Sequence, residues 1–122
     1  MTDNSADAIA EIGAKYLSYG QYEEAWCKFD EAIDIDRTLA WAIFGRAQAK
    51  FGLGRYSDAL EDLSRCIYLL PEFGATYSWR GESYRHLGRL KEAADDFGRA
   101  LDLGRNDEMA IGGRERLSAD AL

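Results

Sequence analysis

Apolar residues recur along the chain at intervals of three and four positions, and the whole pattern repeats after 34 residues. Spacings of three and four place side chains on one face of an α-helix, whereas a strand alternates at every second residue. A glycine marks each period, at Gly20, Gly54 and Gly88. A fixed period of this size predicts a repeat protein, in which each unit buries its apolar face against the next unit.

Each period divides at its glycine into two helices, because glycine readily adopts the left-handed backbone that ends a helix. The spacing predicts three helix pairs, over residues 6–18 and 22–35, 40–52 and 56–69, and 74–86 and 90–103. A seventh helix over 107–117 is expected to cover the apolar edge of the last pair, as repeat arrays require. Residues 1–5 and 118–122 are predicted to be flexible ends.

Small residues are predicted to lie where the two helices of each pair cross, since they let the helix axes approach closely. We expect the small residues of the first helices to face alanines of the second helices, with larger apolar residues filling the flanking volume. The first helices contribute Gly13, Ala47 and Gly81, and the second helices contribute Ala25, Ala59 and Ala93 with Phe29, Leu63 and Phe97.

These columns closely resemble the tetratricopeptide repeat, which pairs two antiparallel helices in 34 residues. The resemblance covers residues 6–105 in three copies, with departures such as Lys50, which replaces a tyrosine of the other copies. It implies an all-α fold, a right-handed superhelix (an α-solenoid) of three helix pairs plus one capping helix. The implied single domain spans residues 6–117, with repeats at 6–39, 40–73 and 74–107.

One pattern of charges predicts ion pairs inside the repeats. Two arginines of first helices share their columns with aspartates of second helices, Arg46 with Asp62 and Arg80 with Asp96. In the first repeat both positions change together, to Ile12 and Lys28. We expect the pairs to join the two helices of one repeat, with coincidence among three copies as the alternative.

The net charge of −7 is accounted for by residues 1–36, which hold nine acidic residues against Lys15 and Lys28. An acidic end argues against nucleic acid as a partner. Two interpretations remain open: a solvated outer face, or a docking patch for a basic partner. No apolar run approaches the length of a membrane span and the polar N-terminus does not read as a signal peptide, so we expect a cytoplasmic protein with no membrane partner.

The residues with metal-binding or catalytic chemistry are few and scattered. Cys27, Cys66 and the single histidine, His86, do not form a metal-ligand spacing. Cys66 takes a position that is alanine in the other repeats, which predicts a small core residue, whereas Cys27 is expected to be exposed. No glycine-rich phosphate loop or nucleophile with a base is present. The chain is therefore predicted to have no metal or cofactor and not to be an enzyme.

The resemblance also implies where a partner protein would bind. In this family the first helices line a concave groove that takes an extended peptide or a helix. Residues of all three first helices project there without serving the repeating columns. The candidates for partner binding among them are Trp41, Phe44, Gln48, Phe51, Trp79, Glu82, Arg85 and His86. Four large aromatics beside an arginine are typical of binding hot spots. The alternative is that some of these rings pack between neighbouring helices.

Members that serve chaperones bind a C-terminal carboxylate through a clamp of lysine, asparagine and arginine side chains. The corresponding residues of this chain are Ala10, Ala14, Gly45, Ala75 and Trp79. None of them makes a charge-assisted hydrogen bond to a carboxylate. The pattern therefore predicts a partner other than a chaperone C-terminal carboxylate.

Two hypotheses for function follow. In the first, the chain is a protein–protein interaction module that binds an apolar or aromatic peptide, or an amphipathic helix, in its groove. In the second, it is a self-associating scaffold, a homo-oligomer that buries the same aromatic surface or the edge near Met109 and Ile111.

Overall fold

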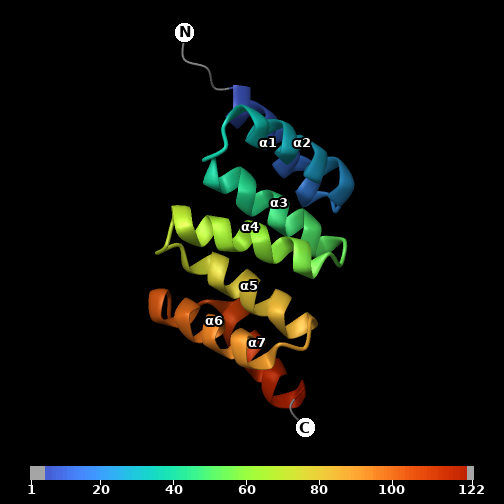
Figure 1. Ribbon diagram of the computed structural model, residues 1–122. Coiled ribbons are helices and arrows are strands. Elements are labelled where there is room, and N and C mark those ends of the chain that lie inside the picture. Colours follow the sequence, from blue (N-terminus) through green and yellow to red (C-terminus); the bar gives the residue numbers. More distant parts are fainter. Residues whose placement is uncertain (1–4, 121–122) are drawn as a thin grey trace.

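The computed structural model describes residues 5–120, and all regular structure in this range is helical. The three first helices are α1 (Ser5–Ser18), α3 (Ala40–Gly52) and α5 (Gly74–His86), and the three second helices are α2 (Tyr22–Ile35), α4 (Tyr56–Leu69) and α6 (Leu90–Leu103); α7 (Glu108–Asp120) follows. Figure 1 shows the helices stacked along one axis in chain order. The predicted all-α solenoid of three helix pairs and a capping helix is confirmed.

The predicted helix boundaries differ from the observed ones only in α1 and α7, and α7 begins at Glu108, one residue later than predicted. Ser5 already belongs to α1, and residues 118–120 continue α7 although they were predicted to be flexible. The last turn of α7 is held because Asp120 accepts a hydrogen bond from Arg85 at 3.0 Å. The rest of the predicted flexible ends, residues 1–4 and 121–122, lies outside the described residues.

The turn inside each repeat depends on its glycine. Gly20, Gly54 and Gly88 have φ angles of 74°, 76° and 78°, the left-handed region predicted for them. In the first turn the Gly20 amide donates to the Leu17 carbonyl at 3.0 Å, and the next amide donates to the Tyr16 carbonyl at 2.9 Å. This pair of bonds is the Schellman motif, which satisfies the last carbonyls of the helix. The same two bonds recur in the other repeats and set each hairpin angle.

The core contact of the first repeat is a phenylalanine ring between two glycines. Phe29 on α2 is 1% exposed. A Cβ atom placed on Gly13 of α1 would lie 3.0 Å from this ring, and one on Gly45 of α3 would lie 2.3 Å from it. The ring therefore occupies the space that side chains of both neighbouring first helices would need. Bare glycine backbones on the two sides let α1, α2 and α3 pack against one ring.

The third repeat has the same arrangement, with Phe97 of α6 between Gly81 of α5 and Gly113 of α7. The second repeat fills the equivalent space differently. Its ring is replaced by the smaller Leu63, which packs with Ala47, Ala59 and the half-buried rings of Phe44 and Trp79. Trp79 occupies the column that holds Gly45 and Gly113, so a large residue on the first helix compensates for a smaller one on the second.

This geometry refines the predicted crossing of the helices. The predicted core residues of the second helices are all buried, at 1% exposure or less. Beside the backbones of Gly13 and Gly81, however, the nearest side-chain atoms belong to the rings of Phe29 and Phe97, not to Ala25 and Ala93 as we expected. The rings are long enough to reach the glycines, so they set the closest approach of the two helices.

The predicted ion pairs join the two helices of one repeat. Arg46 donates two hydrogen bonds to the carboxylate of Asp62, at 3.0 and 2.7 Å. Arg80 binds Asp96 in the same bidentate way, at 2.8 and 2.8 Å. Each arginine also reaches back to the preceding repeat, and Arg46 donates to Asp30 at 2.7 Å. The pairs therefore connect the helices within a repeat as well as successive repeats.

Lys50, which departs from the repeating tyrosine, belongs to the same network. Its ammonium group lies 2.9 Å from Asp62 and 5.2 Å from the centre of the Trp26 ring. The side chain of Asp62 is 6% exposed. This buried carboxylate therefore has two cationic partners, and the indole of Trp26 covers the lysine from the first repeat.

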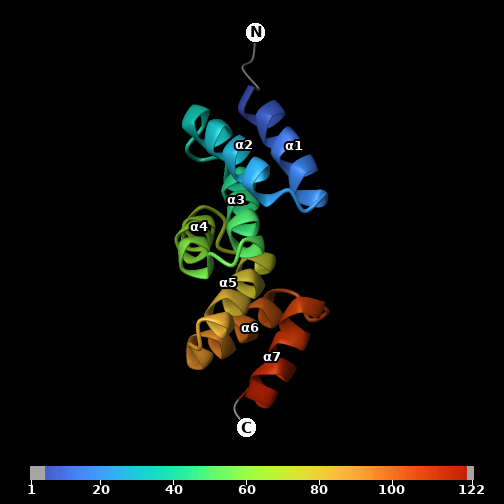
Figure 2. The same cartoon turned by 90° about the vertical axis from the view of Figure 1, so that its right-hand side faces the viewer.

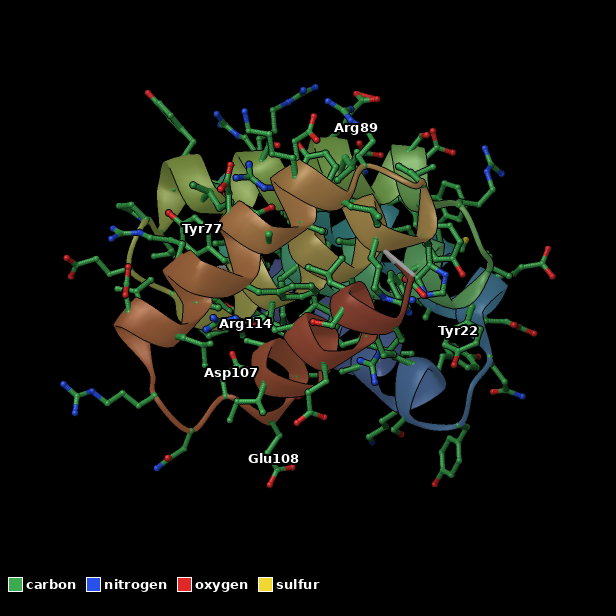
Figure 3. All side chains as sticks on the ribbon, turned by 90° about the horizontal axis from the view of Figure 1, so that it is seen from below. Tyr22, Tyr77, Arg89, Asp107, Glu108 and Arg114 are labelled. Carbon is green, nitrogen blue, oxygen red and sulfur yellow. The ribbon has the colours of Figure 1, made fainter. Side chains whose placement is uncertain are left out.

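The last helix, α7, takes the place that the first helix of a further repeat would have, in contact with both α5 and α6. Asp107 precedes it and accepts a hydrogen bond from the Ala110 amide at 3.0 Å, which satisfies the first turn. The other oxygen of Asp107 accepts a 2.6 Å bond from Ser78 on α5. Figure 3, which views the stack from below, shows α7 in front with Asp107 and Glu108 at its start.

The two cysteines lie where the repeat columns predict. Cys66 is 1% exposed, and burial raises the pKa of its thiol to about 12. Cys27 is exposed. The interior thiol therefore stays protonated and acts as a small apolar residue.

The glycine contacts predict a pair of opposite effects on stability. Gly45→Ala should lower the free energy of unfolding by about 1–3 kcal/mol, because the new Cβ overlaps the buried Phe29 ring. Gly98→Ala on α6 should raise it by about 0.5–1 kcal/mol, since open space surrounds that position and alanine favours the helix. Urea denaturation measures both. Adding Phe29→Leu to Gly45→Ala should restore part of the lost free energy of unfolding. No restoration would contradict the proposed overlap between the new Cβ and the Phe29 ring.

The network around Asp62 predicts a large effect of one carboxylate. Asp62→Ala should destabilise the fold by roughly 3 kcal/mol, because it leaves two partly buried cations without their partner. Asp30→Ala removes a carboxylate from the same arginine, but the Asp30 side chain is 48% exposed. We expect Asp30→Ala to lower the free energy of unfolding by less than about 1 kcal/mol. Equal losses in the two variants, measured by chemical denaturation, would show that burial of Asp62 is not the cause.

Candidate binding groove

The first helices form one continuous row along the stack. Contacts join α1 to α3, α3 to α5 and α5 to α7. Figure 2 shows α1 and α7 projecting to the same side at the two ends, with α3 and α5 between them. The residues predicted to bind a partner all lie on α3 and α5, in the middle of this row.

A pocket of about 470 Å³ opens on this row. Its walls come from the ends of the first helices and from the first residues of α2 and α4. The lining residues are Leu17, Tyr22, Gln48, Phe51, Gly52, Tyr56, Trp79 and His86. The structure thus brings together four of the predicted partner-binding residues. Tyr22 and Tyr56 were missed, because they belong to a repeating column and repetition alone indicates a structural role.

The aromatic rings of the pocket are ordered around Phe51. Its ring lies edge-on to Trp79, Tyr56 and His86, with centroid distances of 5.1, 5.0 and 5.5 Å. His86 in turn stacks on Tyr56 at 4.4 Å with an interplanar angle of 9°. Edge-to-face and stacked contacts of this kind stabilise each other beyond the area that they bury. The pocket therefore has preformed aromatic walls.

Phe44 continues the line of rings toward the start of α5. It lies edge-on to Trp79 at 6.4 Å and to Phe73 at 5.2 Å. Phe44 is half-buried and packs against Leu63, so it is largely part of the fold. Phe44 therefore packs between neighbouring helices, which was the alternative to a role in partner binding.

Trp41 lies apart from the pocket. It is 39% exposed, and its indole nitrogen donates a 3.0 Å hydrogen bond to Asp7 of α1. The bond joins the first turns of α1 and α3. Any contact of Trp41 with a partner stays a prediction.

Glu82 and Arg85 form ion pairs with residues of α7. Arg85 donates to both oxygens of Glu82, at 3.1 and 3.3 Å, and to Asp120. Arg116 of α7 also donates to Glu82, at 3.3 Å. The side chains of Glu82 and Arg85 are only 8% and 14% exposed. The two residues hold α7 against α5 at the end of the groove, and a partner would have to compete for them.

The five positions that correspond to the carboxylate clamp differ in their surroundings. Ala10 is fully buried, and the backbone of Gly45 faces the Phe29 ring. Ala14, Ala75 and Trp79 are half-buried. Guanidinium groups do occur near this face, but on Arg85 and Arg116, at columns outside the clamp.

Within residues 5–120, no three His, Cys, Asp or Glu side chains gather so that they could hold a metal ion. In the same range, no helix has the length and apolar character needed to cross a membrane.

Comparison with known sequences finds tetratricopeptide repeat proteins. The family described as tetratricopeptide repeat matches residues 74–107. A DnaJ homolog subfamily C member 3 from Rattus norvegicus is 38% identical over 91 residues, which is 75% of this chain and 18% of that protein. The chain thus spans less than a fifth of the length of the curated relatives that it matches.

Solved structures are similar over almost the whole chain. The first TPR domain of the human RPAP3 protein is 30% identical, with a TM-score of 0.88 over 93% of this chain and 90% of that one. The first TPR domain of Spaghetti (RPAP3), bound to the HSP90 peptide SRMEEVD, is 29% identical, with a TM-score of 0.91 over 98% of this chain and 96% of that one.

The second of these structures overturns one prediction. Exclusion of a chaperone C-terminal carboxylate as the partner is wrong, because a domain with the same fold and 29% identity is bound to such a peptide. Cationic side chains occur near this face outside the five clamp positions, on Arg85 and Arg116.

The ion network around Glu82 predicts that one carboxylate keeps α7 in place. Glu82→Ala should speed amide hydrogen exchange in the second half of α7 by about tenfold, equivalent to roughly 1.4 kcal/mol of local stability. Glu92→Ala is the matched control, since Glu92 in the first turn of α6 forms an exposed pair with Arg89, the residue that precedes this helix. Unchanged exchange in α7 of the Glu82 variant would contradict this role.

Proposed function

Because the chain belongs to the tetratricopeptide repeat family, we propose that it is a protein–protein interaction module whose concave groove binds a peptide segment of a partner. The observation that carries this proposal is the pocket between the first helices, where Phe51, Trp79 and His86 present preformed walls to one side of the stack. A preformed site lowers the entropic cost of binding, and aromatic walls are the commonest source of binding energy.

The chemistry of the pocket favours an apolar side chain of the peptide. Aromatic rings and Leu17 form most of the walls, while Gln48, His86 and the tyrosine hydroxyl groups supply hydrogen-bonding atoms. A chaperone tail such as SRMEEVD fits this description in part. Its methionine and valine suit the aromatic walls, and its carboxylates suit Arg85 and Arg116 if they exchange partners with Glu82. We include such tails among the proposed ligands.

A self-associating scaffold is less favoured. Phe44, Phe51 and Trp79 already contact one another inside the chain, which leaves only part of each ring for a second copy. At the capping edge, Ile111 is 41% exposed, but charged residues surround it on α7.

A binding role requires no catalytic group, and we propose that the chain is not an enzyme. The similarity to a TPR domain that is bound to a peptide supports this, as does the use of Glu82, Arg85 and His86 in structural contacts. A cytoplasmic location stays a prediction from the sequence.

The groove proposal is tested by peptide binding with residue-level mapping. Fluorescein-labelled SRMEEVD and 12-residue peptides selected from a random library are titrated against the ¹⁵N-labelled protein. We expect saturable amide shifts at Gln48, Phe51, Trp79 and His86. The double variant Gln48→Ala with His86→Ala should weaken binding at least about fivefold, the loss of roughly 1 kcal/mol typical of a contact residue.

Tyr68→Ala is the matched control, because Tyr68 on α4 is 76% exposed and lies outside the pocket. It should bind like the parent protein. Peptides that bind without shifting the groove amides, or that bind the double variant and the parent equally, would overturn the proposal. An unchanged unfolding midpoint shows that the double variant keeps its fold.

A further inference from the structure

A second apolar surface lies at the turn between α4 and α5. It consists of Leu69, Leu70, Pro71, Glu72 and Phe73 together with Arg99 of α6, and we call it the α4–α5 turn surface. Leu70 and Phe73 are 46% and 43% exposed. The equivalent turns of the other repeats carry polar residues or glycine at the position of Leu70, namely Asp36 and Gly104. Leu70 is thus an apolar residue that the repeat does not require, while the positions of Leu69 and Phe73 are also apolar in the first repeat, where Ile35 and Leu39 occupy them.

The surface is hollowed and held rigidly. These six residues line a cavity of about 570 Å³, and none of them lines the groove pocket. The Tyr77 hydroxyl donates to the Pro71 carbonyl at 3.0 Å, and the Leu70 amide donates to the Cys66 carbonyl at 2.7 Å. The ring of Phe73 is supported from behind by Phe44. A turn held from both sides is preorganised to receive an apolar side chain.

Charges of opposite sign border the cavity. Arg99 places its guanidinium 5.7 Å from the centre of the Tyr77 ring and forms no ion pair with any carboxylate of residues 5–120. Glu72 likewise has no cationic partner within the described range. An incoming carboxylate is therefore attracted to the side of Arg99 and repelled on the side of Glu72, which selects both the partner's charge and its direction.

We propose that the α4–α5 turn surface is a second docking site, separate from the groove, for a partner segment of defined chemistry. The segment carries a large apolar side chain within two residues of an aspartate or glutamate. Its apolar group occupies the cavity beside Leu70 and Phe73, and its carboxylate pairs with Arg99. A weak, transient contact is expected, since one side chain and one exposed ion pair bind.

The test uses two peptides that differ in one charge, acetyl-GLFDG-amide and acetyl-GLFKG-amide, titrated into the ¹⁵N-labelled full chain. The aspartate peptide should shift the amides of Leu69, Leu70, Glu72 and Phe73 and the Nε–H signal of Arg99. Arg99→Gln should weaken this binding two- to fivefold, and Leu70→Ser about threefold or more. Arg105→Gln and Leu87→Ser, exposed residues at other turns, are matched controls that should bind like the parent chain.

Three outcomes would overturn the proposal. The lysine peptide could bind as tightly as the aspartate peptide, which would remove the role of Arg99. The shifts could fall on the groove residues alone, which would leave the turn surface unoccupied. The amides of Leu69, Leu70, Glu72 and Phe73 could instead shift on dilution of the protein without peptide, which would identify a second copy as the occupant. Because the amides of the two sites are distinct, failure here is distinguishable from failure of the groove proposal.

Discussion

The fold depends on the contact between a phenylalanine ring and bare glycine backbone on both sides of it. Phe29 lies between Gly13 and Gly45, and Phe97 lies between Gly81 and Gly113. One ring therefore fixes the distance within a helix pair and the distance to the next pair at the same time. Because the interior is close-packed, neither distance can change without moving the other. The stacking of first helices, and with it the line of the groove, follows from this size match.

The second repeat shows how the same constraint shapes the groove. Leu63 is shorter than the phenylalanine of its column, and the volume that it leaves is filled from the first helices by Ala47 and Trp79. Trp79 can stand in the glycine column only because the opposing residue is small. Its ring then extends toward Phe51 and Phe44, and so forms the aromatic line. The most prominent residue of the candidate site is thus a product of core complementarity, and site and core cannot vary independently.

The fold could be predicted almost completely from the sequence, because the 34-residue period aligns every residue with its structural equivalents. The glycine turns followed from one column, and the Arg46–Asp62 pair followed from two columns that change together. The site could be predicted only in part, since most of its residues do not repeat and so give no such coupled change to show which of them meet in space. Tyr56 lies in a repeating column and yet lines the pocket against His86. Glu82 lies in a groove column and yet binds Arg116, a contact visible only once α7 is placed.

The two ends of the groove are stabilised by different physical interactions. Over α1, α3 and α5, each first helix is held by its own second helix through buried apolar contacts. The last helix, α7, has no second helix among the described residues. Its attachment combines the Gly113–Phe97 contact, the Ser78–Asp107 hydrogen bond and the ion pairs of Glu82 and Arg85. Two of these ion pairs have an exposed partner, Arg116 at 50% and Asp120 at 40%. Exposed charges are screened by salt, whereas buried apolar contacts are not. The end of the groove at α7 is therefore the part whose shape depends most on ionic conditions, and it is also the part where a charged ligand would meet the arginines.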